Sequence, residues 1–229
     1  MIKYDLRISR GHLIVELADG LYIIDTGSPF SIGMGEFITI AEKNYSSNSV
    51  MSEFVNLPNM KEFIGVELVG LIGCDILMDY CCIFDLKNLK LVLSNEKFLE
   101  DEINFVCTDL KIFQNTPYIN INIAGKTVNS FIDTGATISY FRKNFLNNLT
   151  SFRTEYDTHP LIGSFQTNIF NYQIQIENKV FDIEVGILPS KLDSMFDMID
   201  ADAVIGYELI KDKITVFDFL SKKFLIQKY

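Results

Sequence analysis

The feature that most constrains the fold of this chain is a repeat within its own sequence. Residues 23–28 read I-I-D-T-G-S and residues 131–136 read F-I-D-T-G-A, so the motif returns after 133 − 25 = 108 positions. An apolar-apolar-Gly segment at 71–77 returns at 204–210, after 206 − 73 = 133 positions. Two copies are too few for a solenoid, which needs at least three repeats. The repeat instead predicts two similar lobes related by a pseudo-two-fold axis.

Local patterns favour β-structure in both halves of the chain. Runs rich in β-branched and aromatic residues, several of them separated by turn signals, predict strands at 12–17, 21–25, 90–94, 118–122, 172–177, 180–188 and 223–227. Helical stretches are few, and the two best begin just after Gly73 and Gly206. We therefore expect an all-β protein with a short helix in each lobe, the lobes spanning residues 1–103 and 104–229.

Composition limits the partners and the compartment. The 229 residues include 20 Lys and Arg against 30 Asp and Glu, a net charge of −10, and no dense basic cluster interrupts the acidity. Such a surface repels phosphate backbones, so we expect no nucleic-acid partner. No apolar run reaches the roughly 18 residues of a membrane span, and no export signal is visible. We expect no membrane association and a cytoplasmic location.

The residue types that usually bind metals are scarce and scattered. The chain has four cysteines and two histidines, at Cys74, Cys81, Cys82, Cys107, His12 and His159. They lack the paired spacing of a zinc site and the density of a disulfide scaffold. We expect the cysteines to be buried, reduced thiols, and we expect neither a metal nor an organic cofactor.

The two D-T-G tripeptides are suited to acid–base chemistry. In each copy a strand delivers an aspartate to a tight turn, where glycine lets the other half of the chain approach closely. Asp25 and Asp133 could then meet at the axis. Two adjacent carboxyl groups do not both ionise readily, so they share a proton, and one acts as base while the other acts as acid. Such a pair could activate a water molecule to attack a carbonyl carbon.

These residues resemble the pepsin and retropepsin clan of aspartic peptidases, in which an apolar-apolar-D-T-[GS]-[STA] turn is paired with an apolar-apolar-Gly segment. The resemblance covers both halves, and it implies that Asp25 and Asp133 form a catalytic dyad sharing one proton, for which this clan is a standard example. The active-site turns would be Thr26, Gly27 and Ser28 in the first lobe and Thr134, Gly135 and Ala136 in the second, with the two threonines bonding across the axis. Because each half is close in size to one retropepsin subunit, the chain resembles a fused retropepsin dimer.

The resemblance also implies an endopeptidase whose peptide or protein substrate binds as an extended chain between the lobes. We expect a monomer that is active at mildly acidic to near-neutral pH. Ser28 in one turn and Ala136 in the other predict an asymmetric dyad, because a hydroxyl can hydrogen-bond a nearby carboxylate and lower its pKa, whereas alanine cannot.

In this clan a hairpin called the flap folds over the substrate. The interval that would contain it spans 73 − 25 = 48 positions in the first half and 206 − 133 = 73 in the second. The longer interval offers a candidate flap at Ile162, Gly163, Ser164 and Phe165, followed by a strand pair at 169–188, whereas the shorter interval is polar and shows little hairpin pattern. We predict one flap, supplied by the second lobe; a sheet that only closes the lobe is the alternative.

Other functions fit parts of the sequence. A peptidase-like fold that only binds peptides is the main alternative, because fold and function separate readily. Residues 133–137 could pass for the phosphate loop of an actin-like or sugar-kinase ATPase, but the chain has few helical stretches and no second nucleotide motif. A serine hydrolase built on Ser28 lacks the G-x-S-x-G elbow. The adjacent Cys81 and Cys82 could suggest redox control.

Overall fold

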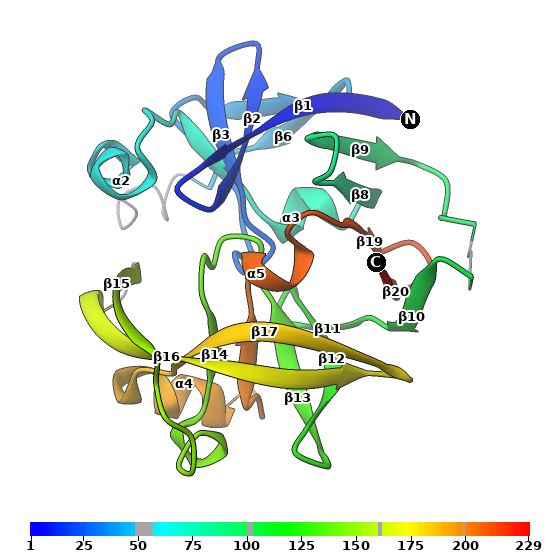
Figure 1. The fold of residues 1–229 in the computed structure, drawn as a ribbon. Helices are drawn as coiled ribbons and strands as arrows, with labels where there is room; N and C mark the ends of the chain where they lie inside the picture. The colour runs from blue at the N-terminus through cyan, green and yellow to red at the C-terminus, as the bar shows by residue number, and fades with distance from the viewer. Residues whose placement is uncertain (49–56, 100–102, 160–161, 199) are drawn as a thin grey trace.

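A computed structural model of the chain describes residues 1–48, 57–99, 103–159, 162–198 and 200–229 (Figure 1). Strands dominate, and most of them belong to two large sheets, with a small separate hairpin. In Figure 1 the first half of the chain forms the upper lobe and much of the second half forms the lower lobe. Among the described helices, none is long and apolar enough to cross a membrane. The prediction of an all-β, two-lobed fold is confirmed.

The elements are short and follow one another closely. In the first half they are β1 (Ile2–Ser9), β2 (His12–Leu17), β3 (Gly20–Ile24), β4 (Ile32–Gly33), β5 (Phe37–Ile40), β6 (Lys43–Ser46), α2 (Leu57–Ile64), β7 (Gly70–Ile72), α3 (Cys74–Leu77), β8 (Cys81–Asp85) and β9 (Lys90–Ser94). In the second half they are β10 (Phe105–Asp109), β11 (Lys111–Phe113), β12 (Thr116–Ile123), β13 (Lys126–Ile132), β14 (Ser139–Phe141), η1 (Lys143–Phe145), β15 (Arg153–His159), β16 (Gly163–Ile176), β17 (Lys179–Ile187), η2 (Ser190–Leu192), α4 (Asp193–Met198), β18 (Ala203–Ile205), α5 (Tyr207–Ile210), β19 (Ile214–Asp218) and β20 (Lys223–Gln227).

The strands expected from the sequence are all present, as β2, β3, β9, β12, β16, β17 and β20, and helices α3 and α5 begin directly after Gly73 and Gly206. Helices α2 and α4 were not expected. The hairpin β5–β6 corrects the expectation that the interval between Asp25 and Gly73 has little hairpin structure. Only Ile38 and Ile40 of this hairpin are fully buried, and the second strand reads K-N-Y-S, so the pair lacks a clear apolar pattern.

Strands from both halves share one sheet. The ten-stranded sheet has the order β10-β20-β19-β8-β9-β1-β2-β3-β7-β4, so three strands of the second half extend the sheet of the first. At the junction β8 pairs with β19, and Ile83 lies opposite Val216. Because 216 − 83 = 133, this pair joins positions related by the sequence repeat. The boundary at residues 103 and 104 falls between β9 and β10, and it stays a prediction.

The buried core is also continuous between the halves. Phe84 and Phe217 are fully buried, and their ring centroids lie 5.5 Å apart in an edge-on contact. The same apolar cluster contains Ile24 and Ile132, which directly precede the two aspartates of the D-T-G motifs. Close packing of this kind resists small displacements. The strands that present the two motifs are therefore anchored in one shared core.

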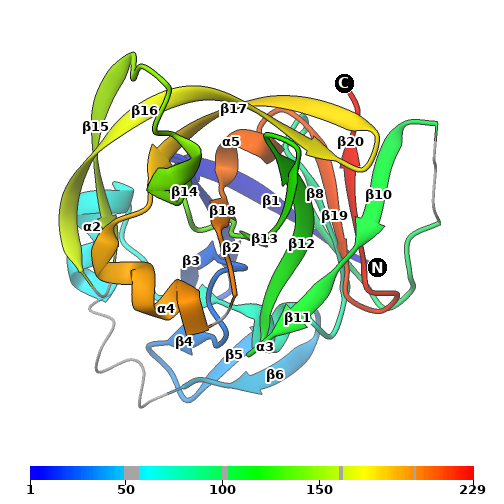
Figure 2. The ribbon, with the colours of Figure 1, turned by 90° about the horizontal axis from the view of Figure 1, so that it is seen from below.

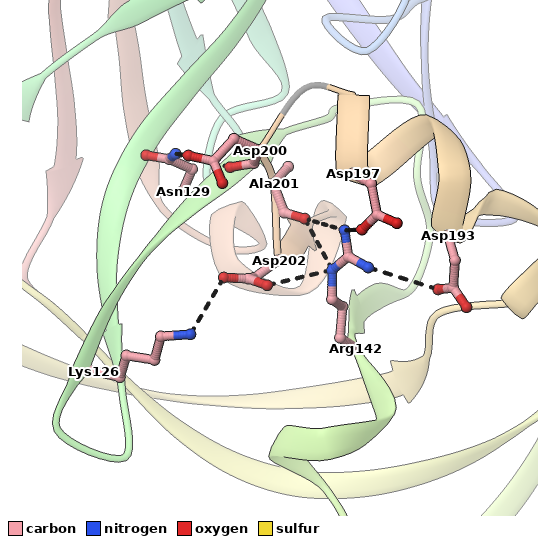
Figure 3. A network of polar contacts seen from close by, with 8 residues as sticks. All are labelled: Lys126, Asn129, Arg142, Asp193, Asp197, Asp200, Ala201 and Asp202. Carbon is pink, nitrogen blue, oxygen red and sulfur yellow. Dashed lines mark hydrogen bonds and ion pairs between the residues drawn. The ribbon is translucent and has the colours of Figure 1, made fainter.

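A network around Arg142 holds the second lobe together beside these strands (Figure 3). The guanidinium of Arg142, only 19% exposed, donates to the carbonyl of Ala201 at 3.0 and 3.1 Å. It also forms ion pairs with Asp197 at 2.8 Å, Asp202 at 3.3 Å and Asp193 at 3.9 Å. One cation thus links β14 to α4 and to the segment that leads into β18.

We predict that Arg142→Met lowers the free energy of unfolding by about 2–3 kcal/mol, because the Ala201 carbonyl loses its charged donor and three carboxylates lose their shared cation. Urea unfolding at neutral pH would measure the change. Arg7→Met is the matched control, since Arg7 and its partner Glu16 are 65% and 59% exposed and such pairs contribute no more than about 1 kcal/mol. Equal losses in the two variants would contradict the assigned role of the network.

Candidate active site

The two aspartates occupy matching places at the ends of matching strands. Asp25 follows β3, which runs parallel to β7, and its amide donates to the carbonyl of Ile72 at 3.0 Å. Asp133 follows β13, which runs parallel to β18, and its amide donates to the carbonyl of Ile205 at 2.9 Å. The second repeated motif therefore supplies the neighbouring strand that fixes each aspartate.

Two threonines connect the turns across the lobes. The amide of Thr26 donates to Oγ1 of Thr134, and the amide of Thr134 donates to Oγ1 of Thr26, each at 3.0 Å. The hydroxyls in turn donate to the carbonyl oxygens of Ile132 and Ile24, at 2.7 and 2.9 Å. Both threonines are fully buried. Four hydrogen bonds in a dry environment therefore hold the two turns in register.

Glycine is required in both turns because each turn lies against the carboxyl group of the other lobe. A Cβ atom added to Gly27 would lie 2.3 Å from Cγ of Asp133, and one added to Gly135 would lie 2.5 Å from Cγ of Asp25. No other residue fits without displacing a carboxyl group. The close approach brings the carboxyl groups of Asp25 and Asp133 near each other, so that the charge of one acts on the other.

Backbone donors orient both carboxyl groups in the same way. Oδ1 of Asp25 accepts hydrogen bonds from the amides of Gly27 and Ser28, at 2.8 and 3.1 Å. Oδ1 of Asp133 accepts the corresponding pair from its own turn, at 2.8 and 3.2 Å. Both residues remain partly accessible. Each carboxyl group is thus fixed through Oδ1, which two backbone amides of its own turn hold in place.

The surroundings favour retention of a proton by the pair. Burial is the main factor that raises the pKa of Asp25 well above its ordinary value, and the charge of Asp133 raises it further. The amides of Gly27 and Ser28 act in the opposite direction, but they do not outweigh burial and repulsion. A carboxyl group with such a pKa can hold a proton beside an ionised partner, which an acid–base pair requires.

The expected role of Ser28 is wrong. Its hydroxyl donates to the carbonyl of Phe30 at 2.7 Å, and its contact with Asp25 is made by the backbone amide. Ala136 makes the same amide contact with Asp133. The hydroxyl therefore does not distinguish the two carboxyl groups, because the turn directs it toward a carbonyl two residues along the chain.

The two histidines were not predicted to belong to this site, yet both lie near Asp133. His12, the first residue of β2, interacts with the backbone of Gly135 and with the charges of Asp157 and Asp133. His159, the last residue of β15, also lies within reach of the charges of Asp133 and Asp157. Burial lowers the pKa of each histidine despite the two acidic groups. No local motif marks these histidines, because only the fold brings them to the second turn.

The candidate flap lies at the tip of a long hairpin. Strands β15 and β16 pair in antiparallel register up to His159 and Gly163, so Ile162, Gly163, Ser164 and Phe165 lie at or beside the tip. Pro160 and Leu161 of the same segment lie outside the described residues.

Tyr140 anchors this hairpin to the strand that follows the second D-T-G turn. Its ring centroid lies 5.9 Å from that of Phe165 on β16, and its hydroxyl donates to Oδ2 of Asp157 on β15. Figure 2 shows β15 and β16 on the side opposite β10, β19 and β20. The hairpin thus lies away from the second-half strands that join the sheet of the first half.

The four cysteines form no disulfide, and Cys74, Cys81 and Cys82 are buried as expected. Cys107 is partly exposed, which corrects the expectation for that residue. The thiol of Cys74 donates to the carbonyl of Thr26 at 3.2 Å, so it helps to fix the first D-T-G turn. Within the described residues, no group of three or more His, Cys, Asp or Glu side chains has a metal-binding arrangement.

Comparison with solved structures finds distant likenesses to proteases. The simian foamy virus (mac) protease has 16% identity and a TM-score of 0.31 over 41% of this chain and 90% of its own. A retropepsin-like aspartic protease from Rickettsia conorii has 15% identity and a TM-score of 0.38 over 54% and 89%. A foamy viral protease–reverse transcriptase in complex with an RNA/DNA hybrid has 16% identity and a TM-score of 0.33 over 41% and 11%. No protein-family model and no curated protein sequence matches the chain. Likenesses this distant carry no argument about activity.

The raised pKa of Asp25 predicts a pH-dependent effect of Asp25→Asn. A carboxyl group whose pKa is raised by folding contributes stability at low pH, and this contribution is lost as the pH rises through its folded-state value. Removing the charge should therefore raise the free energy of unfolding at pH 8, and the gain should vanish as the pH falls toward the ordinary carboxyl value near 4. Urea unfolding of both proteins across this range would measure it.

Asp5→Asn provides a control of opposite sign. Lys90 lowers the pKa of exposed Asp5, so its contribution is present above the ordinary carboxyl pKa and lost in acid. Any decrease in the free energy of unfolding of this variant should appear at pH 8 and become smaller in acid. If Asp25→Asn destabilised the protein at pH 8, the assigned electrostatics of the pair would be wrong.

Proposed function

We propose that this chain is an aspartic endopeptidase of the pepsin and retropepsin clan, which hydrolyses extended peptides held between its two lobes. One observation carries the proposal: Gly27 and Gly135 each lie against the opposite aspartate, so that the carboxyl groups of Asp25 and Asp133 come close to each other. A structural role alone does not explain two facing carboxyl groups, since their proximity opposes folding when they ionise.

The proposed reaction uses the pair as acid and base at once. The ionised carboxylate takes a proton from a water molecule as the water oxygen bonds to the scissile carbonyl carbon. The protonated carboxyl group donates its proton toward the carbonyl oxygen, so charge on the tetrahedral intermediate is neutralised. The C–N bond then breaks: the leaving nitrogen receives the proton that had been taken from water, and a hydroxyl group of the intermediate returns a proton to the other carboxylate. A carboxylic acid and an amine result, and the dyad again holds one proton. No covalent adduct with the protein forms.

We also propose that the chain is an internal duplication that works as a monomer, like a retropepsin dimer fused into one polypeptide. The matching amide bonds of Asp25 and Asp133, and the pairing of Ile83 with Val216, support this interpretation. Each half supplies one turn, and the threonine contacts need both halves. Residues 1–103 and 104–229 would be the two lobes.

The hairpin tip at Ile162, Gly163, Ser164 and Phe165 is proposed as the flap. The proximity of His159 to Asp133 supports a location beside the dyad. The first lobe has no corresponding candidate among its described residues, because β5–β6 packs on its own lobe: Tyr45 and Tyr80 share a hydrogen bond at 2.8 Å.

Cleavage of a denatured protein or a peptide library from pH 3 to 8 tests the proposed function. We expect cleavage by the unmodified protein, inhibition by pepstatin, and loss of at least a thousandfold in rate in both Asp25→Asn and Asp133→Asn. Asp19→Asn, which changes an aspartate in the turn before β3, should retain activity. Absence of cleavage by the folded protein at every pH would favour the peptide-binding alternative.

The flap proposal has its own test in Phe165→Ala. Losing the contact with Tyr140 should loosen the hairpin and lower kcat/KM about tenfold, because the flap would order the bound peptide less well. Tyr156→Ala removes an aromatic ring from the same hairpin at a position that is 79% exposed, so it serves as the control. If the two variants have equal kcat/KM values, the hairpin does not act as a flap.

A further inference from the structure

The tip of the β1–β2 hairpin reaches from the first lobe to the second D-T-G turn. A Cβ atom added to Gly11 would lie 3.0 Å from Cγ2 of Thr137, so the two backbones are close. The hairpin is also attached to α2, because Oγ of Ser9 donates a hydrogen bond to the carbonyl of Ile64 at the end of that helix. His12 is the residue after Gly11. The contacts of Ser9 and Gly11 therefore fix its position beside the second turn.

His159, which belongs to the second lobe, also lies near this turn. It lies at the end of β15, and its register partner Gly163 lies at the hairpin tip. The hydroxyl of Tyr140 and the amide of Thr158 both donate to the carboxylate of Asp157, which fixes the strand just before the histidine. The two histidines of the chain, 147 positions apart (159 − 12), thus both lie near Asp133.

The charged groups that face the histidines are acidic. Asp133, after β13, and Asp157, on β15, act on both His12 and His159. Arg10, which shares a hairpin with His12, is directed away and donates to the carbonyls of Glu62 and Phe63 in α2. Protonation of either histidine therefore adds a positive charge beside carboxylates.

We propose that His12 and His159 are positioning residues that keep the negative charge of the dyad on Asp133, so that Asp133 is the base and Asp25 is the acid. This inference rests on the proposed peptidase function. The backbone contacts of the two carboxyl groups are nearly identical, and the hydroxyl of Ser28 does not distinguish them. The histidines supply the asymmetry that the two turns lack.

The physical basis is a mutual interaction between charges. A carboxylate stabilises a nearby imidazolium, and the imidazolium stabilises the carboxylate by the same free energy. The effect grows as the pH falls and the histidines gain protons. The histidines should thus extend activity toward lower pH.

Histidine titration by NMR tests the inference without any need for activity. With only two histidines, each ring signal can be assigned through His12→Gln and His159→Gln. In Asp133→Asn both histidine pKa values should fall by about half a unit or more, because a facing charge is lost. In Asp25→Asn they should match the unmodified protein, because the charge already lies on Asp133.

Two other outcomes would overturn the inference. If the charge normally lies on Asp25, then Asp25→Asn would move it to Asp133 and raise both histidine pKa values, while Asp133→Asn would change them little. If neither variant altered the titrations, the histidines would not be coupled to the dyad. Either result would leave the peptidase proposal intact, because cleavage is measured separately.

The pH dependence of kcat/KM provides the second measurement. In the variant with both His12→Gln and His159→Gln, the acid limb of the profile should move to higher pH by about half a unit or more, with the maximal rate less affected. Thr116→Gln, which changes the first residue of β12 as His12→Gln changes that of β2, is the matched control and should leave the limb in place. A uniform drop in rate with an unshifted acid limb would indicate a structural role only.

Discussion

The reciprocal hydrogen bonds between Thr26 and Thr134 are the contact on which the rest of the site depends. Asp25 and Asp133 oppose each other when both ionise, so the turns would separate if nothing else joined them. The buried threonines make four bonds at this point, two of them between the threonines and two to carbonyl groups of the opposite lobe. Glycine in each turn then lets the carboxyl groups meet. The proposed chemistry needs two close carboxyl groups, whose repulsion lowers stability. The buried threonine contacts offset this repulsion at the same place.

A second junction supports the first from the other side of the molecule. The pairing of β8 with β19 and the contact between Phe84 and Phe217 join the halves through backbone and core. Figures 1 and 2 show this junction on the side opposite the hairpin β15–β16. The halves are thus tied together at the shared sheet and at the threonines, which leaves the hairpin attached mainly to its own lobe.

The symmetry of the backbone does not extend to the surroundings of the dyad. The two turns have nearly equal hydrogen-bond lengths, yet His12 and His159 both lie near Asp133. The long hairpin belongs to the second lobe, and the first lobe has the short hairpin β5–β6 and helix α2 in the corresponding interval. Matching strands and turns therefore give the two carboxyl groups nearly equivalent backbone contacts, whereas the segments outside this framework give them different surroundings.

The sequence alone determined the parts of this protein that depend on local pattern and on the repeat. The strands, the helices after Gly73 and Gly206, and the pairing of Asp25 with Asp133 follow from residues that are close in the chain or repeated within it. Only the tertiary structure decided where the hydroxyl of Ser28 points, and that two histidines far apart in the chain lie near one of the aspartates. The reason is physical: a motif specifies its own backbone, whereas the electrostatics of a carboxyl group depend on every segment that the fold brings within a few ångströms.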